Sequence, residues 1–395
     1  MTYSPADPSD VGLLSPVSAG MVAETRTGDG AVLAAMVTAE VALVRALVQT
    51  GIAPAGTERV ITRIEAADLD PRDLAVAATV AGNPVVPLVK RLRDQVDPKD
   101  AAWVHFGTTS QDIVDTALMV VASEVTRRLE ADLTRLASTL ADLADRTRTL
   151  SAVARTLTQQ ALPTTLGFRV AGWLAGVHDA VRMVRTCTTL PVSLGGPVGT
   201  ASAYGADGPA VLEAFAAHLG QRAAVGSWHT RRTPIVGLAT ALTISGASCA
   251  KIAADVLVMS QTEIGEAREG TGGPSSAMAH KANPAQSLLV ASAAQQLPAL
   301  GSIIGASAAP EQERPAGAWQ AEWQTLRMML RLASGAAERT ANLVEEIVFD
   351  HDALARNLAT LVGAVGKDDS WVTSHTEHIG IWIDRVLQQH SEVFA

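Results

Sequence analysis

The stretch LATALTISGASCAKIAADVLVMSQTE, residues 238–263, decides the fold. Residues recur in it in alternating steps of four and three, and only Ser245 and Glu263 interrupt an otherwise apolar series. This spacing is a heptad seam, which predicts a long helix that buries one face. The seam consists of Leu238, Leu242, Ser245, Cys249, Ile252, Val256, Met259 and Glu263.

A second long pattern extends from about residue 111 to residue 150, again with apolar residues at spacings of three and four. Thirty or more helical residues at 1.5 Å each give a helix about 50 Å long, far more than a compact domain needs. Helices of this length are typical of a bundle. The repeating residues are Leu118, Val121, Val125, Leu129, Leu133, Leu136, Leu140 and Leu143.

Shorter periodic segments surround these two patterns. Aromatic residues make up only 4% of the chain and alanine is abundant, which favours helix over sheet. No strand alternation of any length is visible, residues 1–27 are expected to be irregular, and the segment from Phe349 is short and mixed. The sequence therefore predicts an all-α bundle of long helices. Further helices are expected at about 28–51, 57–67, 71–80, 85–96, 168–187, 209–219, 288–304 and 319–348.

The composition argues against several classes of protein. A net charge of −9 without a basic block argues against non-specific nucleic-acid binding, although a local cationic cluster still permits an anionic small substrate. Cys187 and Cys249 form neither a disulfide framework nor a zinc motif. The chain shows no signal-peptide pattern and no long uncharged apolar run, so we expect a soluble, cytoplasmic protein without membrane contact.

Three polar segments, 105–112, 155–167 and 270–287, interrupt the helical patterns. Thr109 or Ser110 is suited to cap the helix that follows, and such a helix N-terminus attracts anions. The third segment, GTGGPSSAMAHKANPAQS, has glycines that permit positive φ and ends in an Asn-Pro turn signal. Each segment lies at the end of a long helix, so we expect ends from different helices or different subunits to form one pocket.

The three polar segments also carry a family resemblance. HFGTTSQDIVDTAL (105–118), RTLTQQALPTTLG (155–167) and PSSAMAHKANP (274–284) resemble, in the same order, the three signature regions of the fumarase/aspartase superfamily. The resemblance implies a helical N-terminal domain (1–108), a central long-helix domain (109–345) and a shortened C-terminal domain (346–395). It also implies a homotetramer with a twenty-helix core and active sites shared between subunits.

That superfamily removes a proton next to a carboxylate, and a group leaves from the neighbouring carbon. By position, the resemblance makes Ser275 the base, activated by loop N–H groups and by the charge of Lys281. It implies a small polycarboxylate as substrate and neither metal nor other cofactor. It assigns Ser275, Lys281 and His105 to catalysis, and Thr109, Ser110, Gln111, Gln159, Ser276, Met278, Asn283 and Arg314 to substrate binding.

Two features narrow the branch of the superfamily. Adenylosuccinate and argininosuccinate lyases carry a histidine after the Arg-Thr of the second region, where this chain has Leu157, and a general acid is less needed when the leaving group is a stable carboxylate. GTTSQD (107–112), Gly172-Trp173, WHTRRTP (228–234) and ERPAGAWQAEW (313–323) resemble the 3-carboxy-cis,cis-muconate cycloisomerases. The resemblance implies intramolecular formation of 4-carboxymuconolactone in protocatechuate breakdown, the β-ketoadipate pathway, with Arg314 on one substrate carboxylate.

Two other interpretations stay open: an adenylosuccinate lyase-like or other C–N/C–O lyase of the same superfamily, and a non-catalytic helical scaffold. Pro274, Ala279 and Ala282 depart from the family's third region and leave the substrate undecided. We expect that region to form a mobile lid, and the third-domain helices to be largely missing after about Leu361. His229 and His280 are expected at the surface, and Glu40, on the apolar face of the first long helix, is either solvated or paired.

Overall fold

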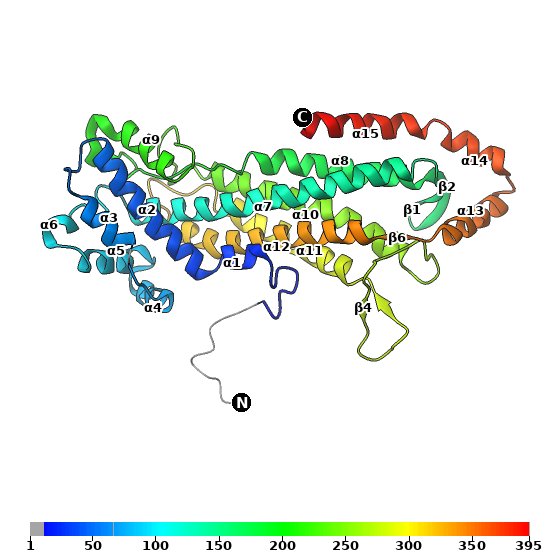
Figure 1. Cartoon of the computed structure of the whole chain (residues 1–395), viewed down its shortest axis with the longest axis horizontal. Coiled ribbons are helices and arrows are strands. Elements are labelled where there is room, and N and C mark those ends of the chain that lie inside the picture. Colours follow the sequence, from blue (N-terminus) through cyan, green and yellow to red (C-terminus); the bar gives the residue numbers. More distant parts are fainter. Residues whose placement is uncertain (1–11, 66, 395) are drawn as a thin grey trace.

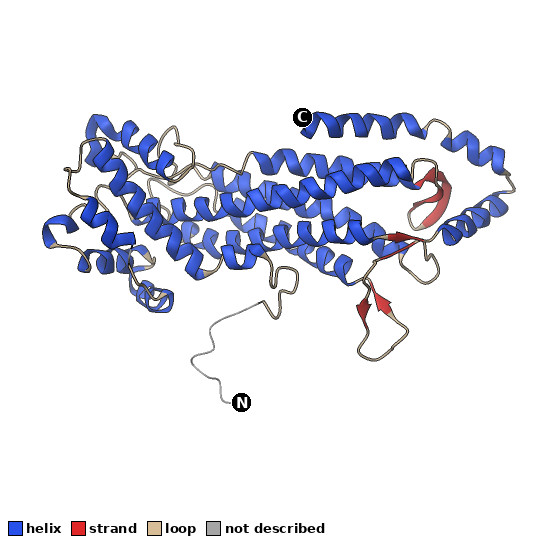
Figure 2. Cartoon of the chain, in the orientation of Figure 1, coloured by secondary structure: helices blue, strands red, loops and turns tan. Residues whose placement is uncertain are grey.

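The computed structural model describes residues 12–65 and 67–394, and residues 1–11 of the expected irregular N-terminus lie outside this range. The chain forms an elongated bundle of long helices, as Figures 1 and 2 show. The predicted all-α, long-helix fold is confirmed. The long helices are α7 (Ser110–Arg146), α8 (Leu166–Arg185), α10 (Thr233–Met259), α11 (Ala285–Ala306) and α12 (Ala318–Glu346).

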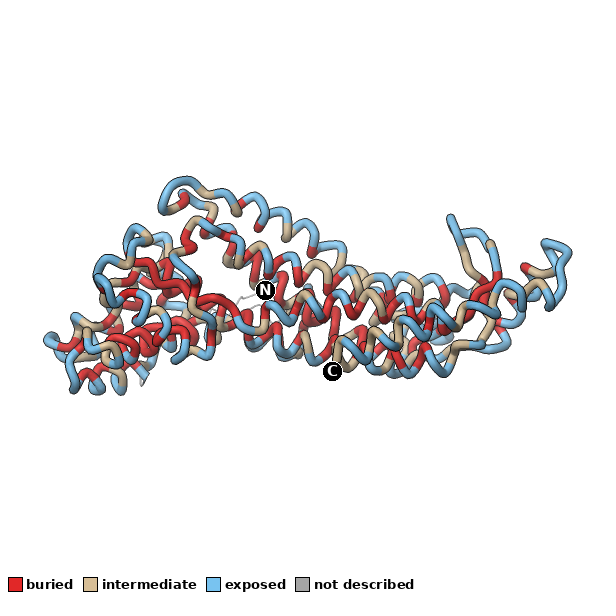
Figure 3. The backbone as a smooth tube through the Cα atoms, turned by 90° about the horizontal axis from the view of Figure 1, so that it is seen from above, coloured by how far each residue is buried: buried red, intermediate tan, exposed pale blue. Residues whose placement is uncertain are grey.

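The heptad seam of the sequence becomes the buried face of α10. Leu238, Leu242, Cys249, Ile252 and Val256 are each fully buried, which accounts for the regular steps of three and four. In Figure 3 the buried residues extend along the whole bundle. Burial of these apolar faces, rather than helix propensity alone, is what stabilises helices of this length.

Shorter helices gather at the end of the bundle where α7 begins (Figure 1). The longest of them, α2, packs along α7 and buries Leu43, Val44 and Leu47. The set consists of α2 (Asp29–Gln49), α3 (Glu58–Glu65), α4 (Pro71–Ala81), α5 (Val85–Asp94), α6 (Pro98–Ala101), α9 (Gly208–His218) and a 3-10 helix, η1 (Ser202–Asp207). The short helix α1 (Val22–Arg26) lies further along the bundle, against α7 and α12.

The expectation of no strands is wrong, because three two-stranded antiparallel pairs occur in the described residues. The longest is the hairpin of β1 (Ser151–Thr156) and β2 (Gln159–Thr165), whose turn residues Leu157 and Thr158 both have positive φ. The polar spacing of this segment hid the alternation, and a register shift between Ala154 and Arg155 interrupts it further. The other pairs join β3 (Ala267–Arg268) to β6 (Val348–Phe349), and β4 (Gly273–Pro274) to β5 (Ala282–Asn283).

The C-terminal segment is also more regular than expected. Instead of a mixed segment with few helices, the structure has α13 (His351–Val365), α14 (Asp369–Thr376) and α15 (Ile379–Phe394). The last of these turns back and lies along α8 (Figure 1). Its Ile383 is fully buried, whereas Ile381 and Trp382 are 67% and 56% exposed, so a single narrow apolar stripe holds it in place. The division at 108/109 and 345/346 stays a prediction.

Three helices are long and apolar enough to cross a membrane, judged by length and composition alone, which differs from the sequence expectation. All three belong to the bundle. The most apolar windows of α2 and α10 are 61% and 50% buried, but that of α11 is only 22% buried. Helix α11 therefore presents an apolar face that the described part of one chain leaves largely uncovered.

The contact between α15 and α8 predicts an acid-sensitive C-terminus. Fully buried His178 on α8 meets Gln389 and His390 of α15, with Arg182 and Asp179 nearby. Burial, helped by the charge of Arg182 and by that of His390 when it is protonated, lowers the pKa of His178 from 6.5 to about 4. A depressed histidine pKa favours the folded state above pH 6.5, and this stability is lost as the pH falls from 6.5 towards 4.

We therefore expect the melting temperature to fall more between pH 7 and pH 5 in the wild type than in His178→Leu. The control is His378→Leu, because the His378 side chain is 80% exposed. Thermal unfolding followed by circular dichroism measures the difference. Equal acid sensitivity in all three proteins would show that His178 does not carry it.

Candidate active site

The first polar segment forms the start of α7. Thr109 is the N-cap residue, as the sequence suggested, and Asp112 occupies the third helical position. The Asp112 carboxylate is fully buried and accepts hydrogen bonds from the Thr109 N–H at 3.2 Å and the Thr108 hydroxyl at 3.1 Å. It therefore satisfies donors at a helix end that would otherwise be unpaired.

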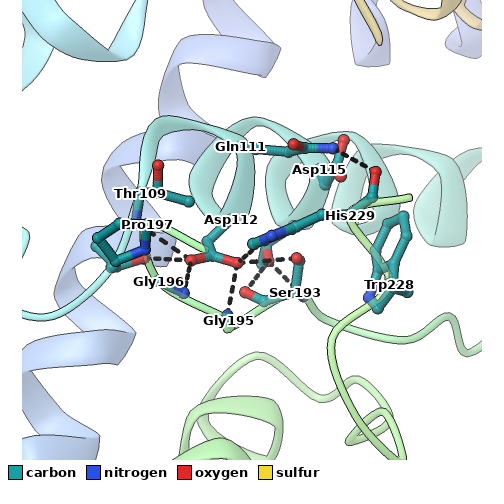
Figure 4. A network of polar contacts seen from close by, with 12 residues as sticks. Thr109, Gln111, Asp112, Asp115, Ser193, Gly195, Gly196, Pro197, Trp228 and His229 are labelled. Carbon is teal, nitrogen blue, oxygen red and sulfur yellow. Dashed lines mark hydrogen bonds and ion pairs between the residues drawn. The ribbon is translucent and has the colours of Figure 1, made fainter. Parts of the chain in front are cut away.

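A distant loop closes over the same carboxylate (Figure 4). The backbone N–H groups of Gly195 and Gly196 each donate to Asp112 at 2.8 Å, and the Ser193 hydroxyl donates at 2.9 Å. Burial alone raises the pKa of Asp112, but hydrogen bonds from His229, Gly196 and Gly195 outweigh it and hold the pKa below its ordinary value. The carboxylate is therefore ionised at neutral pH.

Close approach of the backbone to its neighbours explains why two positions of this region are occupied by glycine. Gly196 has a φ of +71°, and a Cβ there would lie 2.8 Å from the Gly107 carbonyl oxygen. A Cβ on Gly107, whose φ is +69°, would lie 2.7 Å from the ring of Tyr204. Since Tyr204 also donates to the Phe106 carbonyl at 2.8 Å, any side chain at Gly107 would displace the loop that leads into α7.

The sequence placed His229 at the surface, and this is wrong. The residue is 2% exposed, and its Nε2 lies 2.6 Å from the Asp112 carboxylate. The neighbouring Trp228 is fully buried and donates to the Val192 carbonyl, so both residues of this segment lie in the protein interior. The apolar tryptophan beside it was the one available signal for this burial.

Two residues predicted to bind substrate also meet here. The buried Gln111 side chain donates to the His229 carbonyl at 2.9 Å and accepts from the Arg314 guanidinium at 3.0 Å. Arg314 also donates to the Pro197 carbonyl at 2.8 Å. The guanidinium is thus held at the N-terminus of α7 beside Thr109 and Gln111, where both charge and helix dipole favour an anion.

Glu40 is paired, the second of the two possibilities that the sequence left open. It is fully buried on α2 and accepts from the His105 backbone N–H at 3.0 Å, and its other oxygen lies 2.6 Å from Nδ1 of that histidine. His105 has a φ of +60°, a strained backbone conformation for a non-glycine residue. Glu40 therefore fixes both the backbone and the ring of His105.

His105 and Ser110 line a cavity of about 360 Å³ between α5 and the start of α7. Lys90 and Arg93 of α5 line the same cavity, and the sequence analysis missed both. Their signal was the basic cluster at 90–93, which looks like an ordinary helix C-terminus. The cavity thus offers a small anion two cations, a histidine and a hydroxyl, against the single carboxylate of Asp94.

A second buried ion cluster lies behind this site. Arg232 bridges the carboxylates of Asp115 and Glu322, stacks on Trp228, and has a side chain only 1% exposed. Burial alone lowers the pKa of Arg232, but the two carboxylates raise it above its ordinary value. Trp319 adds a hydrogen bond to Asp115 at 2.9 Å, so the cluster ties α7, α10 and α12 together under the site.

The third polar segment forms an exposed hairpin that projects from the opposite end of the bundle (Figure 1). The Ser275 hydroxyl oxygen accepts from the Met278 N–H at 3.1 Å and the Ala277 N–H at 3.4 Å. These are the loop N–H groups expected to stabilise a serine alkoxide. Exposed residues follow within the same segment: Ser276, Met278 and Lys281, with His280 among them.

The glycines of this hairpin act differently from the expectation, because neither Gly270, Gly272 nor Gly273 has positive φ. They permit close packing instead. A Cβ on Gly270 would lie 2.5 Å from the Glu346 carbonyl oxygen, and one on Gly273 would lie 2.7 Å from the Ala285 side chain. Asn283 completes the hairpin by donating to the Pro274 carbonyl at 3.4 Å.

The second polar segment lies at the same end of the bundle as the third. Leu157, at the hairpin turn, is 95% exposed, and the neighbouring Gln159 is exposed as well. Arg155 holds the hairpin by donating twice to the buried Glu266, at 3.0 and 2.6 Å. Gln159 therefore lies at the end of the bundle opposite to the start of α7.

One chain thus divides the predicted site residues between two places. Helix α7 has 37 residues, so its ends lie about 55 Å apart. His105, Thr109, Ser110, Gln111 and Arg314 gather at its beginning. Gln159, Ser275, Ser276, Met278, Lys281 and Asn283 lie at the other end. Within the described range, no group of three or more His, Cys, Asp or Glu residues is arranged to hold a metal ion.

Comparison with known proteins identifies the class. A family model described as lyase matches residues 21–298. A nitrosuccinate lyase of Streptomyces davaonensis is 42% identical over 374 residues, which cover 90% of this chain and 78% of that protein. A 3-carboxy-cis,cis-muconate cycloisomerase of Bradyrhizobium diazoefficiens is 37% identical over 362 residues, which cover 89% of this chain and 80% of that protein.

A solved structure agrees with these matches. The 3-carboxy-cis,cis-muconate lactonizing enzyme from Pseudomonas putida superposes with a TM-score of 0.86 at 28% identity, covering 97% of this chain and 100% of that chain. The fold and the matches define a helical-bundle lyase of the fumarase/aspartase superfamily. The chain belongs to that family, and it is an enzyme.

The Asp112 network predicts a large loss of stability in Asp112→Asn. The two Asp112 oxygens accept separately from Gly195 and Gly196, so the NH2 group of an amide would face the N–H of one of them, and the charge that faces His229 would be lost. Breaking a buried pair of this kind costs about 3 kcal/mol or more. Asp142→Asn, an exposed position on the same helix, is the matched control and is expected to be near neutral.

Denaturant unfolding of the two variants measures this difference. An Asp112→Asn protein as stable as the Asp142→Asn control would contradict the role given to the carboxylate.

Proposed function

We propose that the protein is a lyase for a small dicarboxylate that carries a weakly basic leaving group, and that nitrosuccinate is its substrate. Ser275 removes a proton from the carbon next to one carboxylate, and that electron pair forms the double bond. The C–N bond breaks, and its electron pair leaves with nitrite. The products are fumarate, nitrite and the proton that the base releases.

The observation that carries this proposal is the second polar segment. Leu157 stands where superfamily members with amine-type leaving groups have a histidine, and its side chain is exposed. Nitrite is a weak base and leaves without protonation, so a site with leucine there is suited to it. The nitrosuccinate lyase relative, 42% identical, supports the same choice.

Lactonisation of 3-carboxy-cis,cis-muconate is the second candidate. In that reaction a substrate carboxylate oxygen adds to a double bond, and the neighbouring carbon takes up a proton. It likewise needs no strong acid at position 157. The 37% identical cycloisomerase and the fold similarity favour it. Lys90, Arg93 and Arg314 provide three cations, which is enough for the three carboxylates of 3-carboxy-cis,cis-muconate as well as for the two of nitrosuccinate.

Each group in the proposed site has a defined role. Ser275, supported by the N–H groups of Ala277 and Met278 and by the Lys281 charge, is the base. Thr109, Ser110, Gln111 and Arg314 bind one carboxylate at the start of α7, with His105 beside it. Gln159, Ser276, Met278 and Asn283 complete the other wall of the site.

We propose that these two walls come from different chains of a homotetramer. Their separation of about 55 Å within one chain supports this, because no single substrate spans that length. The uncovered apolar face of α11 supports it too, since such a face on a water-soluble helix bundle is usually covered by a partner. Second copies of this chain are the partner proposed.

The assembly is tested by light scattering during gel filtration. We expect a mass about four times the 41.0 kDa chain. Ile303→Asp, on the exposed face of α11, is expected to give smaller species, whereas Leu14→Asp, at a position already 94% exposed, is not. A monomeric wild type would contradict the shared site.

The activity is tested with nitrosuccinate, 3-carboxy-cis,cis-muconate and adenylosuccinate in parallel. We expect nitrite and fumarate from the first, at a rate that falls about 1000-fold or more in Ser275→Ala. Ser138→Ala, an exposed serine on α7, is the control. Loss of the muconate absorbance instead would favour the cycloisomerase. Fumarate released only from adenylosuccinate, or full activity in Ser275→Ala, would refute the proposal.

A further inference from the structure

A closed circuit of hydrogen bonds surrounds the start of α7. Five of its links are hydrogen bonds of 3.0 Å or shorter, and the sixth is the peptide bond between Gly196 and Pro197. The residues come from four separate parts of the sequence. Figure 4 shows the part of the circuit around Asp112 and His229. In order, the circuit passes through Gln111, Arg314, Pro197, Gly196, Asp112 and His229, and returns to Gln111.

His229 enters this circuit twice. Its ring meets Asp112 at 2.6 Å, and its backbone carbonyl accepts from Gln111 at 2.9 Å. Because the Asp112 carboxylate is ionised and can only accept, Nε2 of His229 carries the hydrogen between them. The ring therefore fixes the position of the carbonyl that orients Gln111, and Gln111 in turn holds Arg314.

The imidazole itself is out of reach of a substrate. His229 is 2% exposed, and its Nδ1 is buried without a hydrogen-bond partner in the described part of the chain. A Cβ on Gly195 would already lie 2.8 Å from the ring, so the loop packs directly on it. A group enclosed in this way cannot exchange protons with a bound substrate during turnover.

Arg314, in contrast, is only partly buried. Two of the five guanidinium N–H hydrogens meet Gln111 and Pro197, and the remaining three have no partner among the described residues. The circuit thus holds an arginine in one orientation while leaving most of its donors available to an anion. Fixing a flexible side chain before binding removes part of the entropy cost that binding would otherwise carry.

We propose that His229 is a positioning residue, which holds Arg314 through Asp112, Gln111 and the Gly195–Pro197 loop in the orientation that receives a substrate carboxylate. This inference rests on the proposed function in one respect, the role of Arg314. It predicts that His229 acts on substrate binding through Arg314 and has no part in the proton transfer by Ser275.

The test is a double-mutant cycle on the full-length protein with nitrosuccinate. His229→Leu is expected to raise KM about 10- to 100-fold, the effect of losing one hydrogen bond to a charged group, while kcat changes little. Arg314→Ala is expected to raise KM by at least as much. The double variant is expected to be no worse than Arg314→Ala alone, because His229 acts through the arginine.

A conservative variant separates positioning from general damage to the fold. His229→Gln keeps an N–H donor that can reach Asp112, so it is expected to restore most of the affinity lost in His229→Leu. Its melting temperature and that of His229→Leu are measured alongside. Additive effects of His229→Leu and Arg314→Ala, or a fall in kcat with KM unchanged, would overturn the inference.

A measurement that needs no turnover tests the role of His229 independently of the reaction proposed for the enzyme. Crystal structures of the wild type and of His229→Leu are expected to show Arg314 bonded to Gln111 and Pro197 in the first and released in the second. If neither nitrosuccinate nor the muconate is turned over, the proposed function fails. The comparison of the two crystal structures would still show whether His229 holds Arg314 in place. An unchanged Arg314 in His229→Leu would refute the positioning role.

Discussion

The ionised, buried carboxylate of Asp112 is the interaction on which the candidate site depends. It closes the N-terminus of the longest helix, fixes the Gly195–Gly196 backbone and holds the His229 ring, all within 3.2 Å. These groups compensate for the cost of burying a charge, which a single partner would not do. A second cluster around Arg232 repeats this arrangement one helical turn further along α7.

The length of α7 sets the second constraint. A straight helix of 37 residues keeps its two ends about 55 Å apart, so the serine hairpin and the anion site of one chain cannot meet. A bundle whose long helices carry polar residues at both ends and leave apolar faces open is suited to assembly with other copies. Function in such a protein follows from how chains are arranged as much as from any single site.

The features that the sequence could predict are the local and periodic ones. The heptad steps of 238–263 identified α10, and Thr109 or Ser110 marked the start of α7, because both signals depend on neighbouring residues. His229 was misplaced because its partner Asp112 is 117 positions away, and no local pattern encodes that contact. The hairpin at 151–165 was missed because its polar strands alternate weakly, and α15 because it depends on packing against α8.

The most direct test of a site shared between chains is complementation. His105→Ala and Ser275→Ala each disable one wall, so chains carrying one or the other are co-expressed, co-purified as mixed oligomers and assayed for nitrite release from nitrosuccinate. Random mixing is expected to restore about a quarter of wild-type activity, because one site in four then contains two intact walls. Ser275→Ala mixed with the double variant is the control. No activity above that control, with both chains present in the oligomer, would contradict the shared site.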